Sequence, residues 1–262
     1  MKNFVVFSIL VLLSLSPAAV QTEPAAEKGF TEGVDAKEVI RKMDLLLRGD
    51  SSFGSYRMTI TDPDWQRTLT LNAGENRIDD KTFIEILSPA KEAGIVTLKI
   101  GLEMWNYLPR VERIIKIPPS MMFQPWMGSD FTNDDLVKAS SVVTDYSHEI
   151  VAEEIVSGFQ AYKVELIPKP DAPVVWGRLL VWVRQSDSMP LRQEFFADDG
   201  ELIRVLQFDN IVEVRGREVP TYWEMKPVGE KGRQTTMEVL DLEIDVEIDD
   251  RVFSLRNLKL KN

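Results

Sequence analysis

The sequence predicts a mainly β protein with few helices, built on a large antiparallel sheet. Three observations lead to this fold class. From residue 55 onward, apolar residues recur with a period of two over most of the chain, which is typical of strands. The strand-like runs follow one another at short spacings, whereas parallel strands would need long crossovers. A single antiparallel sheet of this size tends to curl, so the sheet is expected to be curved.

One helix is predicted before the first strand, over residues 35–48. Asp35 can cap it, and Glu38 follows three residues later, as in a capping box. Gly49 suits the position just past the C-terminus of a helix. The apolar residues recur at spacings of three and four and so share one face: Val39, Ile40, Met43, Leu46 and Leu47.

The remainder of the chain reads as about eleven to thirteen strands separated by turn signals such as Ser157-Gly158. In the last run the apolar phase slips from Met237 and Val239 to Leu240 and Leu242, which predicts a β-bulge. The runs lie near residues 55–60, 65–71, 82–87, 96–100, 102–108, 111–117, 149–156, 160–167, 177–184, 189–196, 201–213, 217–226 and 233–246.

Three architectures accommodate such a sheet: a barrel, a half-barrel or two packed sheets. The composition alone does not choose among them. Several strands carry large apolar side chains on both faces, as where Leu179, Val181 and Val183 alternate with Leu180 and Trp182. We therefore expect one face to pack a core while the other meets a helix or lines a cavity.

Residues 118–139 interrupt the strand pattern. Three prolines and one glycine rule out a long regular element, yet the stretch holds three Met, two Phe and one Trp. One interpretation is a flexible hydrophobic lid or floor for an apolar ligand, because methionine adapts to varied apolar shapes. The other is a plug that fills one end of the curved sheet. Residues 132–139 are predicted as a short helix, with Thr132 as cap and Asp135 at the third position.

The first residues have the layout of a secretory signal peptide, predicted over residues 1–19. Met1-Lys2-Asn3 is a short basic start, Phe4 to Leu15 is almost unbroken apolar sequence, and Ser16 and Ala18 are small residues suited to cleavage. The apolar run is short for a membrane anchor. Residues 20–34 are rich in Glu, Thr, Ala, Pro and Gly and are expected to form a flexible leader.

The composition disfavours several classes of function. With 31 Lys+Arg against 42 Asp+Glu, the net charge is −11, which argues against a nucleic-acid partner and against general adhesion to anionic membranes. The chain has no cysteine and a single histidine, His148, so most metal, thiol and triad chemistry lacks its side chains. We expect no enzyme activity, no metal and no cofactor. Asp130, Asp134 and Asp135 lack the alternating spacing of a calcium loop, and helix capping explains them better.

Four stretches of the sequence resemble a known family. They are Met104-Trp105-Asn106-Tyr107-Leu108-Pro109, Arg110 to Lys116, Ser120-Met121-Met122, and Trp126 followed by Met-Gly-Ser-Asp-Phe-Thr-Asn-Asp-Asp-Leu at 127–136. They are similar to the exported outer membrane lipoprotein-sorting protein family, which is related to the LolA and LolB lipoprotein carriers. The resemblance implies a curved, incomplete (half-open) antiparallel barrel over residues 35–262, with helices covering its concave apolar face. It brings no catalytic residues.

The resemblance also implies a periplasmic carrier or chaperone for lipid or for the acyl chains of lipoproteins, with only transient membrane contact. The alternative is a non-carrying accessory module that docks on an inner-membrane transporter. The residues predicted to border an apolar cavity are Trp105, Tyr107, Met121, Met122, Phe123, Trp126 and Met127. Arg110 and Arg113 either pair with a lipid headgroup or partner, since arginine binds phosphate in a fork, or are solvated strand charges.

Overall fold

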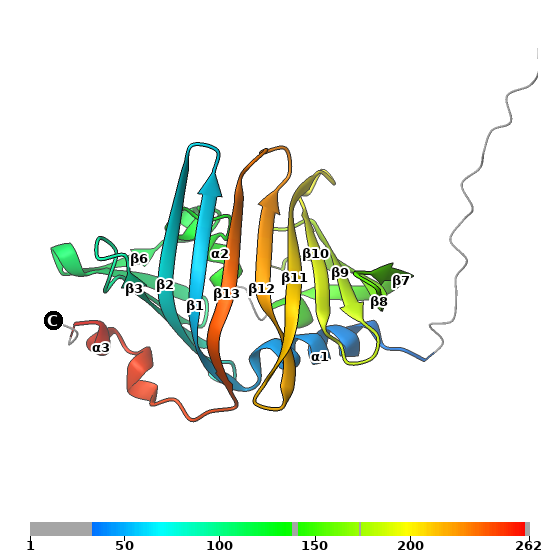
Figure 1. The fold of residues 1–262 in the computed structure, drawn as a ribbon, viewed down its shortest axis with the longest axis horizontal. Helices are drawn as coiled ribbons and strands as arrows, with labels where there is room; N and C mark the ends of the chain where they lie inside the picture. The colour runs from blue at the N-terminus through cyan, green and yellow to red at the C-terminus, as the bar shows by residue number, and fades with distance from the viewer. Residues whose placement is uncertain (1–32, 138–140, 173, 260–262) are drawn as a thin grey trace, which may run out of the picture.

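The computed structural model describes residues 33–137, 141–172 and 174–259. Within these residues, thirteen antiparallel strands form one sheet that curves without closing into a barrel (Figure 1). The predicted fold class, an incomplete antiparallel barrel with few helices, is confirmed. The signal peptide predicted over residues 1–19 and all but the end of the leader lie outside the described residues.

The strand bounds agree closely with the period-two runs of the sequence. The strands are β1 (Ser51–Asp62), β2 (Trp65–Asn76), β3 (Lys81–Ser88), β4 (Val96–Ile100), β5 (Glu103–Leu108), β6 (Arg113–Ile117), β7 (Tyr146–Val156), β8 (Phe159–Pro168), β9 (Arg178–Arg184), β10 (Pro190–Phe196), β11 (Leu202–Val214), β12 (Arg217–Pro227) and β13 (Gln234–Ile244).

The chain enters the sheet at its middle and fills it in two halves. From β1 the strands run outward to β6 at one edge, and the chain then passes to β7 at the opposite edge. From β7 the strands return to the middle, where β13 pairs with β1. We call the connection between the two edges the crossing segment, defined as residues 118–137 and 141–145. Its elements are η2 (Pro119–Met121), η3 (Trp126–Gly128), α2 (Asn133–Val137) and η4 (Ser141–Val143).

The first helix, α1 (Ala36–Arg48), confirms the helix predicted over 35–48. Asp35 is its N-cap, and its side chain accepts a hydrogen bond from the Lys37 backbone N–H at 2.9 Å. Gly49 ends the helix with a φ of 60°, a conformation that glycine adopts without strain. None of the helices in the described ranges is long and apolar enough to cross a membrane.

The predicted β-bulge is also confirmed. In the β1–β13 pair, Ser55 lies opposite Asp241 and Tyr56 lies opposite Val239, so Leu240 is the extra residue. The bulge moves the apolar residues that follow it to the other parity, as the phase slip in the sequence predicts.

The two faces of the sheet are covered differently. On the inner, concave face, Val39, Ile40 and Met43 of α1 pack against β8 to β12, through residues such as Val164 and Val181. The crossing segment covers the same face over β1 to β5, where Trp126 is packed in a second cluster. The inner face is therefore roofed by α1 and the crossing segment, and the space between roof and sheet is where a ligand can be held.

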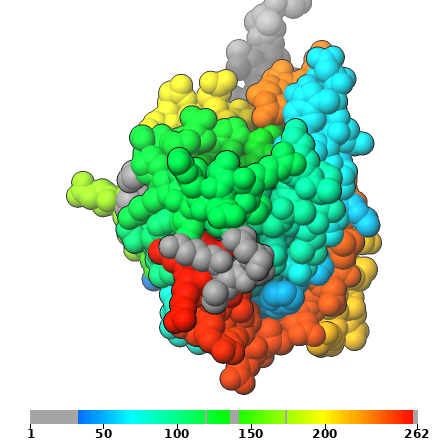
Figure 2. Space-filling view, turned by 90° about the vertical axis from the view of Figure 1, so that its left-hand side faces the viewer, coloured from blue at the N-terminus to red at the C-terminus, as the bar shows by residue number. Residues whose placement is uncertain are grey.

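On the outer face, the C-terminal segment packs on β3, β4 and β5. This segment contains η5 (Asp250–Phe253) and α3 (Leu255–Lys259). Phe253 and Leu258 join a buried cluster with strand residues such as Phe83 and Leu98. In Figure 2 the segment, in red, lies on the surface beside residues coloured green and cyan. The sheet is thus covered on both faces at β3, β4 and β5.

Candidate functional site

The inner face encloses a cavity of about 360 Å³ between the sheet, α1 and the crossing segment. Its lining comes from α1, from the crossing segment and from every strand except β4, β5 and β6. Ligand sites in proteins typically measure about 300–1,000 Å³ and are lined mainly by apolar side chains with a few polar groups. The size and the placement of this cavity therefore suit a small or chain-like apolar ligand.

Aromatic rings form much of the cavity wall. Trp176, in the loop before β9, meets Phe195 of β10 edge-on with ring centroids 5.2 Å apart. Trp223 of β12 contacts Phe208 with centroids 6.0 Å apart and Tyr56 at 6.4 Å. Burial raises the pKa of Tyr56 to about 12, so its phenol keeps its proton at neutral pH. These paired rings make a stiff and uncharged wall.

Charged groups line the cavity at the C-terminal end of α1. Arg48 donates from Nε to Glu75 Oε2 at 2.9 Å and from Nη1 to Asp44 Oδ1 at 3.1 Å. Burial lowers the pKa of Arg48, and the adjacent Asp44 partly offsets this shift, so the guanidinium stays charged. We call Asp44, Arg48 and Glu75 the polar end of the cavity.

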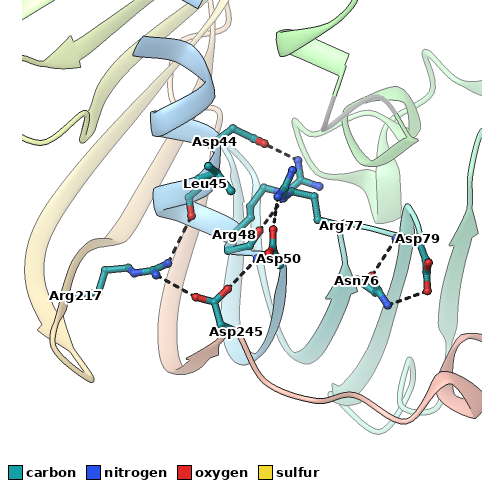
Figure 3. Close-up of polar contacts among 10 residues, drawn as sticks. Asp44, Leu45, Arg48, Asp50, Asn76, Arg77, Asp79, Arg217 and Asp245 are labelled. Atoms are coloured by element: carbon teal, nitrogen blue, oxygen red, sulfur yellow. Dashed lines mark hydrogen bonds and ion pairs between the residues drawn. The ribbon is translucent and has the colours of Figure 1, made fainter. Parts of the chain in front are cut away.

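A second group of ion pairs lies beside the polar end (Figure 3). Arg77 pairs with Asp50, and Arg217 pairs with Asp245 across 3.1 Å. Asp245 also accepts from the Asp50 backbone N–H at 2.9 Å. This network joins Asp50, which follows α1, to residues at the ends of β2, β12 and β13.

Side chains from the sheet hold the crossing segment over the cavity. Trp126 donates from Nε1 to Thr97 Oγ1 of β4 at 3.0 Å. Arg67 of β2 donates to the carbonyl oxygen of Met127. Further along, Arg204 of β11 donates to the carbonyl oxygen of Asp130 at 2.8 Å. These three contacts lie on β4, β2 and β11, which is the order in which the crossing segment passes over the strands of the sheet.

The Met-Gly-Ser-Asp-Phe-Thr-Asn-Asp-Asp-Leu motif at 127–136 supplies many of these contacts. Asp130 is ion-paired with Arg233 at 2.8 Å and accepts from Thr235 Oγ1 at 2.7 Å. The predicted cap of the short helix is confirmed, because Thr132 and Asp135 exchange backbone-to-side-chain hydrogen bonds of 2.6 and 3.2 Å. α2 begins at Asn133, and residues 138 and 139, the end of the helix predicted over 132–139, lie outside the described residues. The polar residues of the motif therefore bind the crossing segment to the sheet and cap α2.

Three of the predicted cavity residues lie on the inner side. Trp126 lines the cavity and is 3% exposed. Met122 and Met127 are partly buried and pack against the same apolar cluster as Trp126. These three residues of the crossing segment lie together, but Met122 and Met127 are not among the residues that line the cavity, and contact of any of the three with a ligand remains a prediction.

The other predicted residues lie elsewhere. Trp105 and Tyr107 do share one face of β5, but it is the outer face, where Val96 and Leu98 pair with them and the C-terminal segment covers them. Met121 and Phe123 are 44% and 62% exposed. Arg110 lies in η1 (Pro109–Val111) and Arg113 in β6, and both are exposed. None of these residues is part of the cavity lining described above.

His148 has a structural contact. Its Nε2 lies 2.7 Å from the carbonyl oxygen of Val142, and burial lowers the pKa of the imidazole. A carbonyl oxygen can only accept, so Nε2 carries the hydrogen. This bond ties β7 to η4 at the end of the crossing segment.

Sequence reasoning did not find the polar end or the arginine anchors. Arg48 and Glu75 are 27 positions apart, and Arg204 is 74 positions from Asp130. The available signal was weak: Asp44 and Arg48 stand four residues apart on the helix, the spacing of a helical ion pair.

Comparisons with known proteins place this geometry in a wider group. A family model described as "Uncharacterized protein" matches residues 78–260. No curated protein sequence matches the chain.

Solved structures share the fold along almost their whole length. An outer membrane lipoprotein-sorting protein domain from Vibrio parahaemolyticus is similar with a TM-score of 0.76 and 22% identity, covering 86% of this chain and 98% of that one. A DUF1329 family protein from Desulfovibrio piger gives a TM-score of 0.77 and 24% identity, with coverage of 85% and 97%. A LolA superfamily protein from Nitrosomonas europaea gives 0.72 and 22%, with coverage of 86% and 99%. The resemblance found in the sequence is thus confirmed at the level of the fold.

Proposed function

We propose that this chain, which belongs to the family whose model matches residues 78–260, is a periplasmic carrier that shields an acyl chain in its cavity. The cargo is a lipid or the acyl part of a lipoprotein. The observation that carries the proposal is the roofed cavity with aromatic walls on the inner face. Each methylene moved from water into such a site contributes about 0.8 kcal/mol, so a long chain is held without covalent chemistry.

Two further observations support the envelope as the setting. The first residues have the layout of a signal peptide. The fold is shared with proteins named for lipoprotein sorting and for the LolA superfamily. Export would be tested by the intact mass of protein recovered from the periplasm, which should lack about the first 18–20 residues.

A cavity-filling variant tests the carrier function directly. Ala73 of β2 lines the cavity, and Ala73→Phe should occupy part of its volume without adding a charge. We expect this variant to bind a fluorescent fatty-acyl probe more weakly than the unaltered protein. Thr70→Phe is the matched control, because alternation along β2 places the same side chain on the outer face.

Unchanged probe binding in folded Ala73→Phe would reject the cavity as the binding site. Native mass spectrometry with lipid extraction of protein purified from the periplasm is the complementary test, because a carrier should retain lipid in its cavity. Protein that carries no lipid and binds no probe would contradict the proposal.

The second candidate is an accessory module that docks on an inner-membrane transporter. One observation favours it: Met121 and Phe123 are exposed at the start of the crossing segment, beside the edge strand β6. Large exposed apolar side chains that gather on a surface can mark a protein contact. If the chain is such a module, Phe123→Asp should weaken its binding to the transporter. The same variant should leave its affinity for the acyl probe unchanged.

A further inference from the structure

We infer that the cavity selects acyl chains with a cationic or neutral polar head and disfavours anionic heads such as a carboxylate or a phosphate. This inference rests on the proposed function, because it takes the cavity as the binding site. It goes further by naming the chemical class of the head and the residues that select it, which are those of the polar end.

The polar end has an excess of negative charge. The single guanidinium of Arg48 faces two carboxylates, those of Asp44 and Glu75. The side chains are 14%, 8% and 18% exposed, respectively, so water screens these charges little. Since Arg48 is already shared between two acceptors, an added anion would meet a group whose net charge is negative.

Nearby cations do not reverse this balance. Among the described residues that line the cavity, Arg48 is the one lysine or arginine. At the roof, Asp134 and Asp135 also line the cavity, and Arg204, which pairs with Asp135, is not among the lining residues. Beside the polar end, the cations have carboxylates of their own: Arg77 with Asp50, Lys99 with Asp80, and Arg217 with Asp245.

The position of the polar end determines how an amphiphile lies in the cavity. A polar head buried among apolar side chains without hydrogen bonds costs free energy, so the head belongs beside Asp44, Arg48 and Glu75. The tail then runs along the aromatic walls toward Trp126 and Phe131 under the crossing segment. An ammonium or hydroxyl head can donate to the carboxylates, whereas a carboxylate head cannot.

The experiment compares three amphiphiles with the same dodecyl tail and different heads. Protonated dodecylamine, 1-dodecanol and dodecanoate compete with an uncharged fluorescent dye for the purified protein at neutral pH and about 0.15 M salt, where exposed charges are screened beyond about 8 Å. We expect dodecanoate to bind about tenfold or more weakly than dodecylamine, equivalent to about 1.4 kcal/mol. The alcohol should bind nearly as well as the amine.

Substitution at the polar end should remove the selection. Glu75→Gln leaves Arg48 paired with Asp44 alone, so the ratio of amine to carboxylate affinity should fall severalfold. Glu201→Gln is the matched control, because it makes the same change in charge at an exposed turn and should leave the ratio unchanged. If Glu75→Gln does not fold, Asp44→Asn makes the corresponding change from the α1 side.

The outcomes separate the two proposals. Equal or tighter binding of dodecanoate would overturn the inference while leaving the cavity as an acyl-binding site. An equal shift in Glu75→Gln and Glu201→Gln would also overturn it, because the selection would then reflect the overall charge of the protein. If the alcohol does not displace the dye, the proposed function fails and the inference fails with it.

Discussion

Arg204 on β11, which is buried, forms an ion pair with the partly buried Asp135, the third residue of α2, although 69 positions separate them in the sequence. The same guanidinium donates to the carbonyl oxygen of Asp130 at 2.8 Å and lies 4.2 Å from the ring centroid of Phe195. Phe195 and Asp135 both line the cavity. This one side chain therefore joins the roof of the cavity to its wall.

Arg204→Met should lower the free energy of unfolding by about 3 kcal/mol, because it leaves the partly buried Asp135 carboxylate without its cation. Adding Asp135→Asn to Arg204→Met should recover part of the loss, since the uncompensated charge is then removed. Urea unfolding of the two single variants and the double variant gives the coupling free energy. A cost below about 1 kcal/mol for Arg204→Met would mean that the pair does not fasten the crossing segment.

Trp126 and Phe123 belong to one apolar stretch of the sequence but should respond very differently to truncation. Trp126 is 3% exposed and donates to Thr97 in the interior, so Trp126→Ala should cost about 3–5 kcal/mol of stability. Phe123 is 62% exposed, and Phe123→Ala should change stability by no more than about 0.5 kcal/mol. Thermal and urea unfolding of both variants measure the difference. Similar costs would contradict the different burial of the two residues.

The elements of the fold could be predicted because their signals are local. Alternation identified the strands, Asp35 and Gly49 marked the ends of α1, and the phase slip located the bulge at Leu240. Thr132 and Asp135 marked the start of α2. Each of these signals depends on residues within a few positions of one another, so a short stretch of sequence is enough to predict each element.

The arrangement of the site could not be predicted in the same way, because it depends on which face of each strand is inside. Alternation shows that Trp105 and Tyr107 share a face, but not which one. Large apolar residues usually indicate the inner face. Here the C-terminal segment, more than a hundred residues later, buries the outer face as well, through Phe253 and Leu258. The cavity lining likewise draws on strands from both halves of the chain, which only the topology brings together.

Phe253→Ala should lower stability without affecting acyl binding. Phe253 is 3% exposed and packs on the outer face with Tyr107, so its loss leaves an apolar gap that should cost about 3–5 kcal/mol. The cavity lies on the opposite face of the sheet. The measurements are the unfolding midpoint and the affinity of the folded fraction for a fatty-acyl probe. A large loss of affinity at unchanged folded fraction would show that the outer face takes part in binding.

His148 should make the stability of the fold depend on pH. Burial lowers the pKa of this imidazole below its ordinary value of 6.5, and the bond to the Val142 carbonyl oxygen offsets part of that shift. The unfolded chain therefore takes up the proton first, and stability present above about pH 6.5 is lost as the pH falls toward the folded-state pKa. His148→Gln retains an N–H donor that can reach Val142 but does not titrate. Urea unfolding between about pH 7.5 and 5.5 should show a larger loss in the free energy of unfolding for the unaltered protein than for His148→Gln. The carboxylates titrate in both proteins, so the difference between the two losses reports the imidazole. Equal losses in the two proteins would show that His148 is not the group responsible.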